Sequence, residues 1–170
     1  RACMSCQPPP FIPPPLAGEG RVGVDVGRVT LHILVLGAAG MIGRKLVERL
    51  TRDGRLGDAA IDKMTLQDVV APRAPDDAGF AIKTVAGDFA VPGFADKLIA
   101  GRPDVIFHLA AIVSGEAELD FDKGYRINLD GTRMLLDAIR AIGDGYKPRV
   151  VFTSSIAVFG APFPEAIGDE

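Results

Sequence analysis

The 170-residue sequence predicts an α/β domain built on a doubly wound parallel sheet. Three observations lead to this fold class. From residue 31 onward, short runs rich in β-branched residues alternate with longer amphipathic runs. A glycine-rich turn joins the first apolar run to the first amphipathic one. In addition, 48% of the residues are apolar, which is enough for one sizeable core.

Each predicted strand is a short apolar run bounded by turn or helix signals, and the strands span residues 31–36, 64–70, 81–85, 105–109 and 150–153. Apolar side chains at helical spacing predict helices over residues 41–51, 94–100 and 121–142. The apolar stripe of the longest helix consists of Tyr125, Leu129, Thr132, Leu135, Leu136, Ile139 and Ile142. These five strands form most of a doubly wound sheet, whose last strand and substrate-binding lobe are not visible in the sequence.

Residues 1–30 differ in composition from the predicted domain, residues 31–170. Prolines crowd the stretch 8–15, and a glycine-rich segment follows it. Such a composition predicts a disordered or polyproline-like extension. We expect this extension not to be part of the working protein. The alternative is that it serves as a proline-rich ligand for another protein. Cys3 and Cys6 form a C-x-x-C pair, which is half of a tetrahedral zinc shell, so we interpret them as incidental and expect no metal site.

Charge and hydropathy narrow the range of partners. The formal net charge of −3 provides no basic excess for a nucleic-acid backbone, so we expect no nucleic-acid partner. No apolar run approaches the ~18 residues that cross a bilayer, and we find no compact secretory signal. We therefore expect a soluble, cytoplasmic protein without a membrane partner.

Gly37, Gly40 and Gly43 lie between the first predicted strand and the first predicted helix. In that place Gly37 allows a sharp turn, Gly40 lets the backbone approach a diphosphate, and Gly43 lets the helix pack closely on the sheet. We expect the freed N–H groups and the positive end of the helix dipole to face the phosphates. The pattern is the dinucleotide-binding fingerprint of Rossmann-type sheets. A Walker-type phosphate loop is excluded because no Gly-Lys-Ser/Thr follows, whereas glycines that serve only a tight turn are the open alternative.

Asp68 lies within the second predicted strand, 25 positions after Gly43 and near the offset of ~20 expected for an acid that binds the adenosine ribose. A carboxylate there would accept hydrogen bonds from both ribose hydroxyls and would repel a 2′-phosphate. We therefore expect NAD, and not NADP, as the cofactor. The alternative is a solvated acid at the end of a strand.

Five motifs occur in a characteristic order: LGAAGMIG at 36–43, GD at 87–88, HLAA at 108–111, NLDGT at 128–132 and FTSSIAVFG at 152–160. Together they make residues 31–170 resemble the extended short-chain dehydrogenases, also called the NAD-dependent epimerase/dehydratase family. The stretches 65–72 and 108–132 look most like the D-erythronate dehydrogenase branch. The resemblance implies an oxidoreductase that oxidises a small sugar acid such as D-erythronate by hydride transfer to NAD.

The resemblance also implies roles for residues in the first two motifs. Met41 and Ile42 would bind the cofactor together with the three glycines. Asp88 would accept a hydrogen bond from the adenine amino group, with Phe89 beside it.

Further roles follow for the third and fourth motifs. His108 is interpreted as a packed strand residue without an evident partner, and not as an acid or base. Asn128 would bind partners on the inner face of the long helix and support the backbone of the site. The small residues after the fourth strand would line the cofactor: Leu109, Ala110 and Ala111.

Ser154 and Ser155 end the fifth predicted strand, at the carboxyl edge where open α/β sheets bind ligands. The resemblance implies that Ser154 lies against the cofactor and that Ser155 is catalytic, because Ser155 precedes the triplet 158–160 by three residues. Ser155 would hydrogen-bond the substrate oxygen that is oxidised. Phe159 replaces the tyrosine usual in that triplet, and ordinary strand-end capping is the alternative for both serines.

The general base of the family is a tyrosine in a Tyr-x-x-x-Lys motif, and this chain has none. Its only tyrosines are Tyr125 and Tyr146, followed four positions later by Leu129 and Val150. We therefore expect the chain by itself to turn over little or no substrate.

Two other functions stay open. A nucleotide-sugar epimerase or dehydratase would share every cofactor residue named above, and a non-catalytic dinucleotide sensor would keep the fold without the tyrosine. The expected partner is a small molecule, either a sugar acid or a nucleotide sugar. A homodimer through the long helix is a further possibility that the sequence leaves open.

Overall fold

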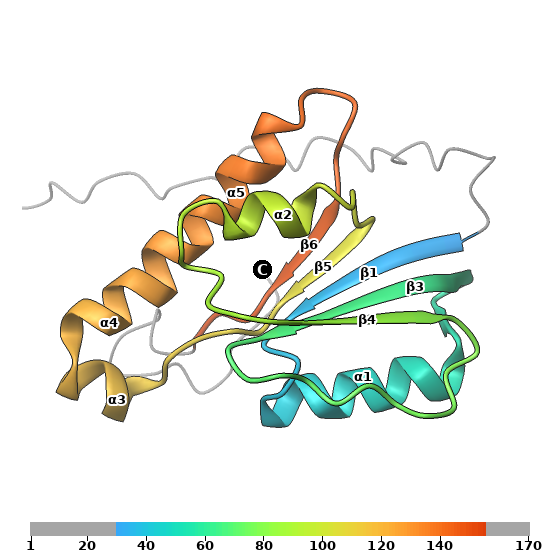
Figure 1. Ribbon diagram of the computed structural model, residues 1–170, viewed down its shortest axis with the longest axis horizontal. Helices are drawn as coiled ribbons and strands as arrows, with labels where there is room; N and C mark the ends of the chain where they lie inside the picture. The colour runs from blue at the N-terminus through green and yellow to red at the C-terminus, as the bar shows by residue number, and fades with distance from the viewer. Residues whose placement is uncertain (1–29, 156–170) are drawn as a thin grey trace, which may run out of the picture.

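The computed structural model describes residues 30–155 of the chain. Its strands are β1 (Thr30–Leu36), β2 (Arg55–Leu56), β3 (Ala59–Asp68), β4 (Ala81–Ala86), β5 (Val105–His108) and β6 (Arg149–Phe152). Its helices are α1 (Met41–Asp53), α2 (Phe94–Ile99), α3 (Ser114–Leu119), α4 (Phe121–Tyr125) and α5 (Thr132–Ala141), with a π-helical segment at Arg126–Gly131. Figure 1 shows α1 below the sheet and α2 and α5 above it.

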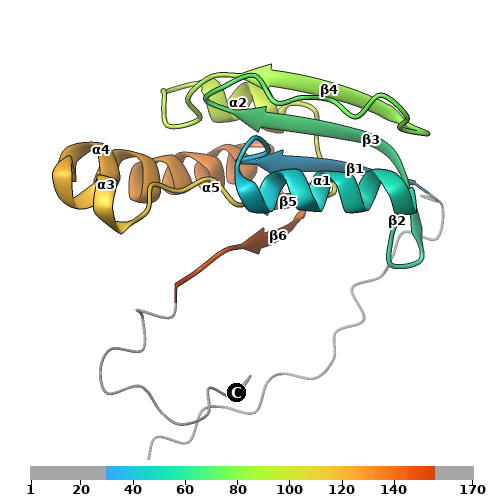
Figure 2. The ribbon, with the colours of Figure 1, turned by 90° about the horizontal axis from the view of Figure 1, so that it is seen from below.

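The strands form one sheet in which β1 lies between β3 and β5. Strand β4 pairs with β3 and strand β6 pairs with β5, so the chain builds outward from β1 first in one direction and then in the other. Figure 2 shows β4 and β6 on opposite sides of β1. All of these pairings are parallel, which confirms the predicted doubly wound parallel sheet. The change of direction between β1 and β5 creates a crevice at the carboxyl ends of these two strands.

Strand β1 forms the centre of two hydrophobic layers because its side chains alternate between the two faces of the sheet. Ile33 and Val35 face α1 and pack into one cluster, whereas Leu34 and Leu36 pack with residues of α2 and α5 into the other. All four side chains are fully buried. Burial on both faces explains why this strand is a continuous apolar run in the sequence.

The second predicted strand has different bounds from those expected. We expected residues 64–70, but β3 spans Ala59–Asp68, and its first two residues pair with β2 in an antiparallel hairpin. Val69 and Val70 are each 61% exposed and lie outside the strand. Pairing with β1 ends at Gln67 because its partner Leu36 is the last residue before the glycine turn. The sequence pattern therefore continues through Val69 and Val70, past the last residue of β3.

The long helix predicted over residues 121–142 is confirmed as one unbroken helical run over residues 121–141, but it is not α-helical throughout. Helix α4, the π-helical segment and α5 follow one another without a gap, and the short helix α3 precedes them. A π-helical turn contains more residues than an α-helical turn, so it rotates the face of α5 relative to that of α4. Consequently Leu135 is buried, while Tyr125, Leu129 and Leu136 from the predicted apolar stripe are about half exposed.

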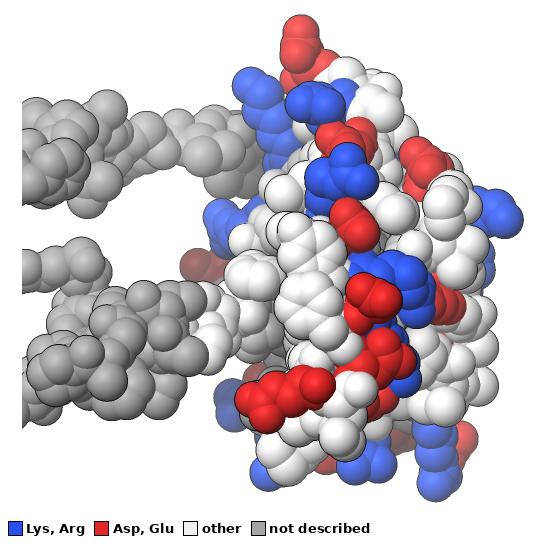
Figure 3. Space-filling view, turned by 90° about the vertical axis from the view of Figure 1, so that its left-hand side faces the viewer, with Lys and Arg blue, Asp and Glu red and all other residues white. Residues whose placement is uncertain are grey.

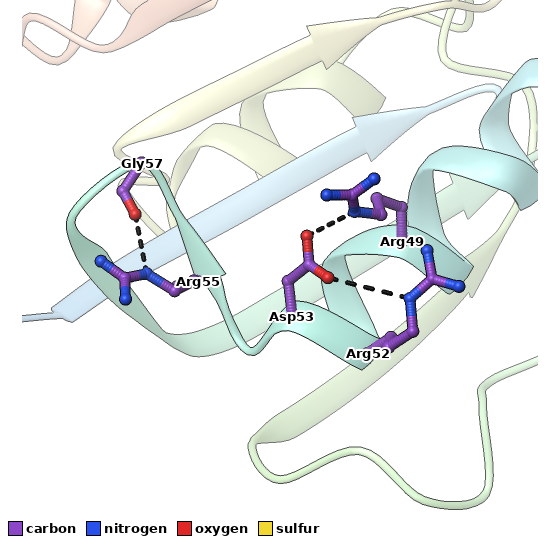
Figure 4. A network of polar contacts seen from close by, with 5 residues as sticks. All are labelled: Arg49, Arg52, Asp53, Arg55 and Gly57. Atoms are coloured by element: carbon purple, nitrogen blue, oxygen red, sulfur yellow. Dashed lines mark hydrogen bonds and ion pairs between the residues drawn. The ribbon is translucent and has the colours of Figure 1, made fainter.

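Helix α1 ends beside a small polar network (Figure 4). Asp53 accepts a hydrogen bond from Arg49 one turn earlier and forms an ion pair with Arg52. The hydrogen bond from Arg49 lowers the pKa of the exposed Asp53 carboxyl. In the following turn, Arg55 Nε donates to the carbonyl of Gly57 at 2.8 Å. The network therefore stabilises the connection from α1 to β3, at the end of the strands away from the crevice.

The predicted extension, residues 1–30, lies outside the described residues except for Thr30, which begins β1. Cys3 and Cys6 lie outside them as well. Within residues 30–155, no helix is both long and apolar enough to cross a membrane.

Candidate functional site

A cavity of about 510 Å³ opens where β1, β3 and β5 end. Its walls come from the glycine turn after β1, the end of β3, the turn after β4, the loop after β5 and the helices α3 and α4 with the π-helical segment. The lining residues are Gly37, Ala39, Gly40, Gln67, Asp68, Val69, Val70, Asp88, Phe89, Leu109, Ala110, Ala111, Ile112, Glu116, Lys123, Arg126 and Ile127. The sequence predicted eight of these seventeen residues.

The glycine turn, residues 37–43, depends on the absence of two side chains. Gly37 has φ +84°, and a Cβ there would lie 2.7 Å from the backbone nitrogen of Ala110. A Cβ on Gly43 would lie 2.1 Å from the carbonyl oxygen of Gly37. The first glycine therefore lets the turn pack against the loop after β5, and the last lets α1 pack against the turn itself.

The backbone N–H groups of the turn were expected to face the phosphates, but three of them donate to carbonyl groups within the protein. Those of Gly37 and Ala38 donate to the carbonyl of Gln67 at 2.9 and 3.0 Å, and that of Gly40 donates to the carbonyl of Gly37 at 3.2 Å. The amides before α1 are therefore already paired within the protein. The N–H groups in the first turn of a helix have no acceptor within the helix. In α1 these are the N–H groups of residues 41–43. The donors offered to an anion are thus those of residues 41–43, and not those of residues 37–40.

Asp68 ends β3 beside this turn and is half-buried. Its Oδ2 accepts a hydrogen bond from the backbone N–H of Ala39 at 2.9 Å, and its Oδ1 accepts one from that of Val69 at 2.7 Å. Asp68 lines the cavity together with Gly37 and Gly40. The structure therefore places a carboxylate beside the glycine turn that leads into α1.

Asp88 follows the turn after β4 and also lines the cavity. Its carboxylate accepts hydrogen bonds from Arg126 Nη1 at 2.6 Å and from the backbone N–H of Ala90 at 2.9 Å. Phe89 lines the same cavity, but it is only 2% exposed and its ring packs edge-on against His108. Phe89 thus fixes the position of Asp88 through the core.

Gln67 is a residue that the sequence analysis missed. It is 1% exposed, its carbonyl holds the glycine turn, and its side-chain amide donates to the carbonyl of Gly87. One residue of β3 therefore holds both the turn after β1 and the turn after β4. A polar residue in a buried strand was the only sequence signal for this role, since buried polar groups need partners.

Asn128 lies in the π-helical segment and is exposed, so the expected inner-face position was wrong. Its side-chain amide nevertheless binds the backbone of the site, as expected. Oδ1 accepts from the backbone N–H of Ile112 and Nδ2 donates to the carbonyl of Ile112, both at 2.9 Å. The side chain therefore clamps the loop after β5, which carries Leu109, Ala110 and Ala111. Asn128 itself does not line the cavity.

His108 is the last residue of β5 and is 2% exposed. Contrary to our expectation it has a partner, because its Nε2 lies 3.0 Å from Thr132 Oγ1, and the Thr132 hydroxyl donates to the carbonyl of Asn128 at 2.8 Å. Burial lowers the pKa of His108 to about 4. The imidazole is therefore neutral near pH 7 and packs between the rings of Phe89 and Phe152.

Ser154 and Ser155 follow β6 and are exposed. Because β6 pairs with β5, they lie at the same carboxyl edge of the sheet as the loop after β5. Neither serine lines the cavity among the described residues. The triplet 158–160 with Phe159, on which the choice of Ser155 depends, lies outside the described residues.

A family model described as the NAD dependent epimerase/dehydratase family matches residues 33–170. The chain belongs to this family. The match covers the glycine turn, Asp68, Asp88 and both serines, and it confirms the resemblance drawn from the five motifs.

Individual proteins similar to this member of the epimerase/dehydratase family include two enzymes of known structure. D-erythronate dehydrogenase of Cupriavidus necator is 42% identical over 144 residues, which are 82% of this chain and 43% of the relative. The crystal structure of a nucleoside-diphosphate-sugar epimerase from Agrobacterium tumefaciens is 64% identical, with a TM-score of 0.77 over 81% of this chain and 41% of that one. A mutant of uronate dehydrogenase from the same organism, complexed with NAD, is 33% identical, with a TM-score of 0.57 over 74% and 41% of the two chains. The chain thus spans about two fifths of the length of these relatives.

The two tyrosines of this family member do not form the missing motif. Tyr146 is buried, its hydroxyl donates to the carbonyl of Pro103 at 2.7 Å, and burial raises its pKa to about 12. Tyr125 lies on α4, is about half exposed, and stacks in a tilted arrangement on Phe121. Neither tyrosine lines the cavity.

The charged side chains at the mouth of the cavity were also missed by the sequence analysis. Lys123 Nζ donates to Glu116 Oε1 at 2.6 Å, and Arg126 pairs with Asp88 at the same distance. Figure 3 shows acidic and basic side chains interleaved on this side of the molecule. The motif-based reading did not identify these residues because they lie between two recognised motifs. Among the described residues, no group of three or more His, Cys, Asp or Glu side chains is suited to hold a metal ion.

Proposed function

We propose that this chain is the NAD-binding part of an oxidoreductase that oxidises a sugar acid such as D-erythronate. The observation that carries the proposal is the cavity at the switch point of the sheet, where the glycine turn before α1 and Asp68 lie together. Its volume is in the range of cofactor pockets. The relatives named above support the proposal, since one is a D-erythronate dehydrogenase and another was crystallised with NAD.

The residues present fit the dinucleotide. The amides of Met41 and Ile42 and the helix dipole would hold the diphosphate. Asp68 would accept hydrogen bonds from the adenosine ribose and Asp88 one from the adenine amino group. The loop from Leu109 to Ala111 would lie against the rest of the cofactor, with its position fixed by Asn128.

When bound, NAD supplies an acceptor for the hydride that leaves the carbinol carbon of the substrate. Ser155 would hydrogen-bond the hydroxyl of that carbon and hold it in position, with Ser154 beside the cofactor. The proton of the hydroxyl needs a base, and the chain contains no Tyr-x-x-x-Lys motif to provide one.

Replacing Asp68 with asparagine is expected to reduce the preference for NAD over NADP by about tenfold or more. Asparagine removes the charge that repels a 2′-phosphate, while its amide oxygen can still accept from the N–H of Ala39. Dissociation constants for both dinucleotides, measured by calorimetry, test this. Asp62→Asn on the same strand is the matched control, because Asp62 is exposed and does not line the cavity. An unchanged preference in Asp68→Asn would contradict the role of Asp68, and no uptake of either dinucleotide by the unchanged chain would contradict the proposed function.

The 170-residue chain is expected to form little or no NADH from NAD and D-erythronate, because loss of a positioned base costs on the order of 10² to 10⁴ in rate. The measurement is NADH absorbance over time. A chimera that joins residues 31–155 to the rest of the Cupriavidus necator relative is the positive control, and Ser155→Ala in this chimera is expected to slow it. Rapid NADH formation by the chain alone would refute the expectation.

A second candidate is a nucleotide-sugar epimerase, because the relative with 64% identity is named as one. Every cofactor contact described above would be the same, so only the substrate differs. A chain that retains only dinucleotide binding, as a sensor, would give binding in calorimetry and no turnover in the chimera. A homodimer, a cytoplasmic location and the role of residues 1–30 stay predictions.

A further inference from the structure

The ion pair between Asp88 and Arg126 joins two parts of the cavity wall that are far apart in sequence. Arg126 Nη1 donates to Asp88 Oδ2, and the backbone N–H of Ala90 donates to Asp88 Oδ1. Both residues line the cavity, and the exposed fractions of their side chains are 43% for Arg126 and 25% for Asp88. The carboxylate is therefore held from two sides and is still accessible from the cavity.

The position of Arg126 is set by packing in the core. Arg126 begins the π-helical segment, and Gly131 ends it. A Cβ on Gly131 would lie 2.6 Å from the ring of Phe89, so this glycine lets Phe89 pack directly against the segment. Since Phe89 follows Asp88, the same packing brings Asp88 and Arg126 together. By contrast, Arg133 pairs with Asp130 at 3.5 Å on the surface, with 65% of its side chain exposed.

The Asp88 carboxylate has capacity for one more hydrogen bond of a particular kind. An ionised carboxylate offers about four acceptor sites, and the contacts with Arg126 and Ala90 use two of them. A ligand group that donates, such as an amino group, can bind there. A ligand group that only accepts, such as a carbonyl oxygen, would meet the lone pairs of the carboxylate.

We propose that Arg126 is a positioning residue for recognition of the adenine ring, because its ion pair orients the Asp88 carboxylate toward the adenine amino group. This inference rests on the proposed NAD-binding function and extends it to a residue outside the five motifs. Arg126 acts through Asp88. Its effect is therefore specific to the amino group of the ligand, and it differs from a general contribution to binding.

The test compares NAD with nicotinamide hypoxanthine dinucleotide, in which a carbonyl oxygen replaces the adenine amino group. The unchanged chain is expected to bind NAD about tenfold more tightly than this analogue. In Arg126→Gln we expect most of that preference to be lost, mainly through weaker NAD binding. Arg126→Lys keeps a charged donor and is expected to retain an intermediate preference. Arg133→Gln, the control for an exposed arginine of the next helix, is expected to change neither affinity.

The possible outcomes separate the explanations. If Arg126→Gln weakens both dinucleotides by the same factor, Arg126 is only part of the wall, and the proposal is overturned. If Arg126→Gln binds NAD more tightly, Arg126 competes with adenine for Asp88, and the proposal is also overturned. If the unchanged chain binds neither dinucleotide, the proposed function itself fails and this inference fails with it. Circular dichroism melting curves check that each variant is folded.

Discussion

Gly43→Ala is expected to destabilise the chain by about 3 kcal/mol, the upper part of the range for overpacked sites. The new methyl group would lie 2.1 Å from the carbonyl oxygen of Gly37 and 2.8 Å from the Cα of Ala38. Both contacts are with backbone, so relief requires α1 to move away from the turn. Loss of that packing would also displace the first-turn amides of α1, and we expect NAD binding to be lost together with stability.

Urea unfolding followed by circular dichroism measures this effect. Gly115→Ala is the matched control, because Gly115 also lies in a helix and an added Cβ there meets nothing within 4 Å. Alanine at that position is expected to leave stability unchanged or to raise it by up to about 1 kcal/mol. Equal unfolding midpoints for Gly43→Ala and the unchanged chain would show that the close contact with Gly37 is not rigid.

Acidification is expected to weaken the fold through His108. Its pKa is about 4 in the folded chain, against an ordinary value of 6.5. The unfolded chain therefore binds more protons between these two values, and the free energy of unfolding falls as the pH drops from 6.5 to 4. The full difference is on the order of 3 kcal/mol, and it is fully present as stability above pH 6.5.

The measurement is the urea midpoint at a series of pH values between 7.5 and 4, for the unchanged chain and for His108→Gln. Carboxylates titrate in both proteins, so the difference between their pH slopes isolates the imidazole. A smaller slope in His108→Gln is expected. Identical slopes would mean that His108 takes up its proton in the folded state as readily as in the unfolded one.

The glycine turn and the positions of most strands along the chain could be predicted because each depends on local sequence. Gly37 and Gly43 mark places where the backbone packs against backbone, and only glycine allows this. The strands β1 and β5 are buried on both faces and so form continuous apolar runs. For these elements the residue types alone determine the structure.

The π-helical segment inside the helix over residues 121–142 could not be predicted from helical spacing. The apolar residues follow a single stripe in sequence, but the π-helical segment divides it into two faces. That segment is specified by tertiary contacts, such as the packing of Phe89 on Gly131 and the bond of Thr132 to His108. These contacts join residues more than twenty positions apart, and the spacing of apolar residues along one helix cannot predict them.

The same limit applies to the site. Asp68 and Asp88 were found because motifs mark them, whereas Gln67 and Arg126 act on those carboxylates and their turns from positions that no motif covers. The prediction that the backbone N–H groups of residues 37–40 face the phosphates was wrong for a related reason. A glycine pattern shows where the backbone can bend, but only the fold shows which carbonyl is close enough to accept.

The pairing of the Gly37 and Ala38 amides with a single carbonyl of β3 has a thermodynamic consequence. Because these donors and the N–H of Ala39 are already saturated, we expect the loop before α1 to keep its shape when a ligand binds. An incoming diphosphate would therefore meet a preorganised receptor and lose little conformational entropy on complexation. In amide hydrogen exchange, these three positions should be as slow without dinucleotide as with it.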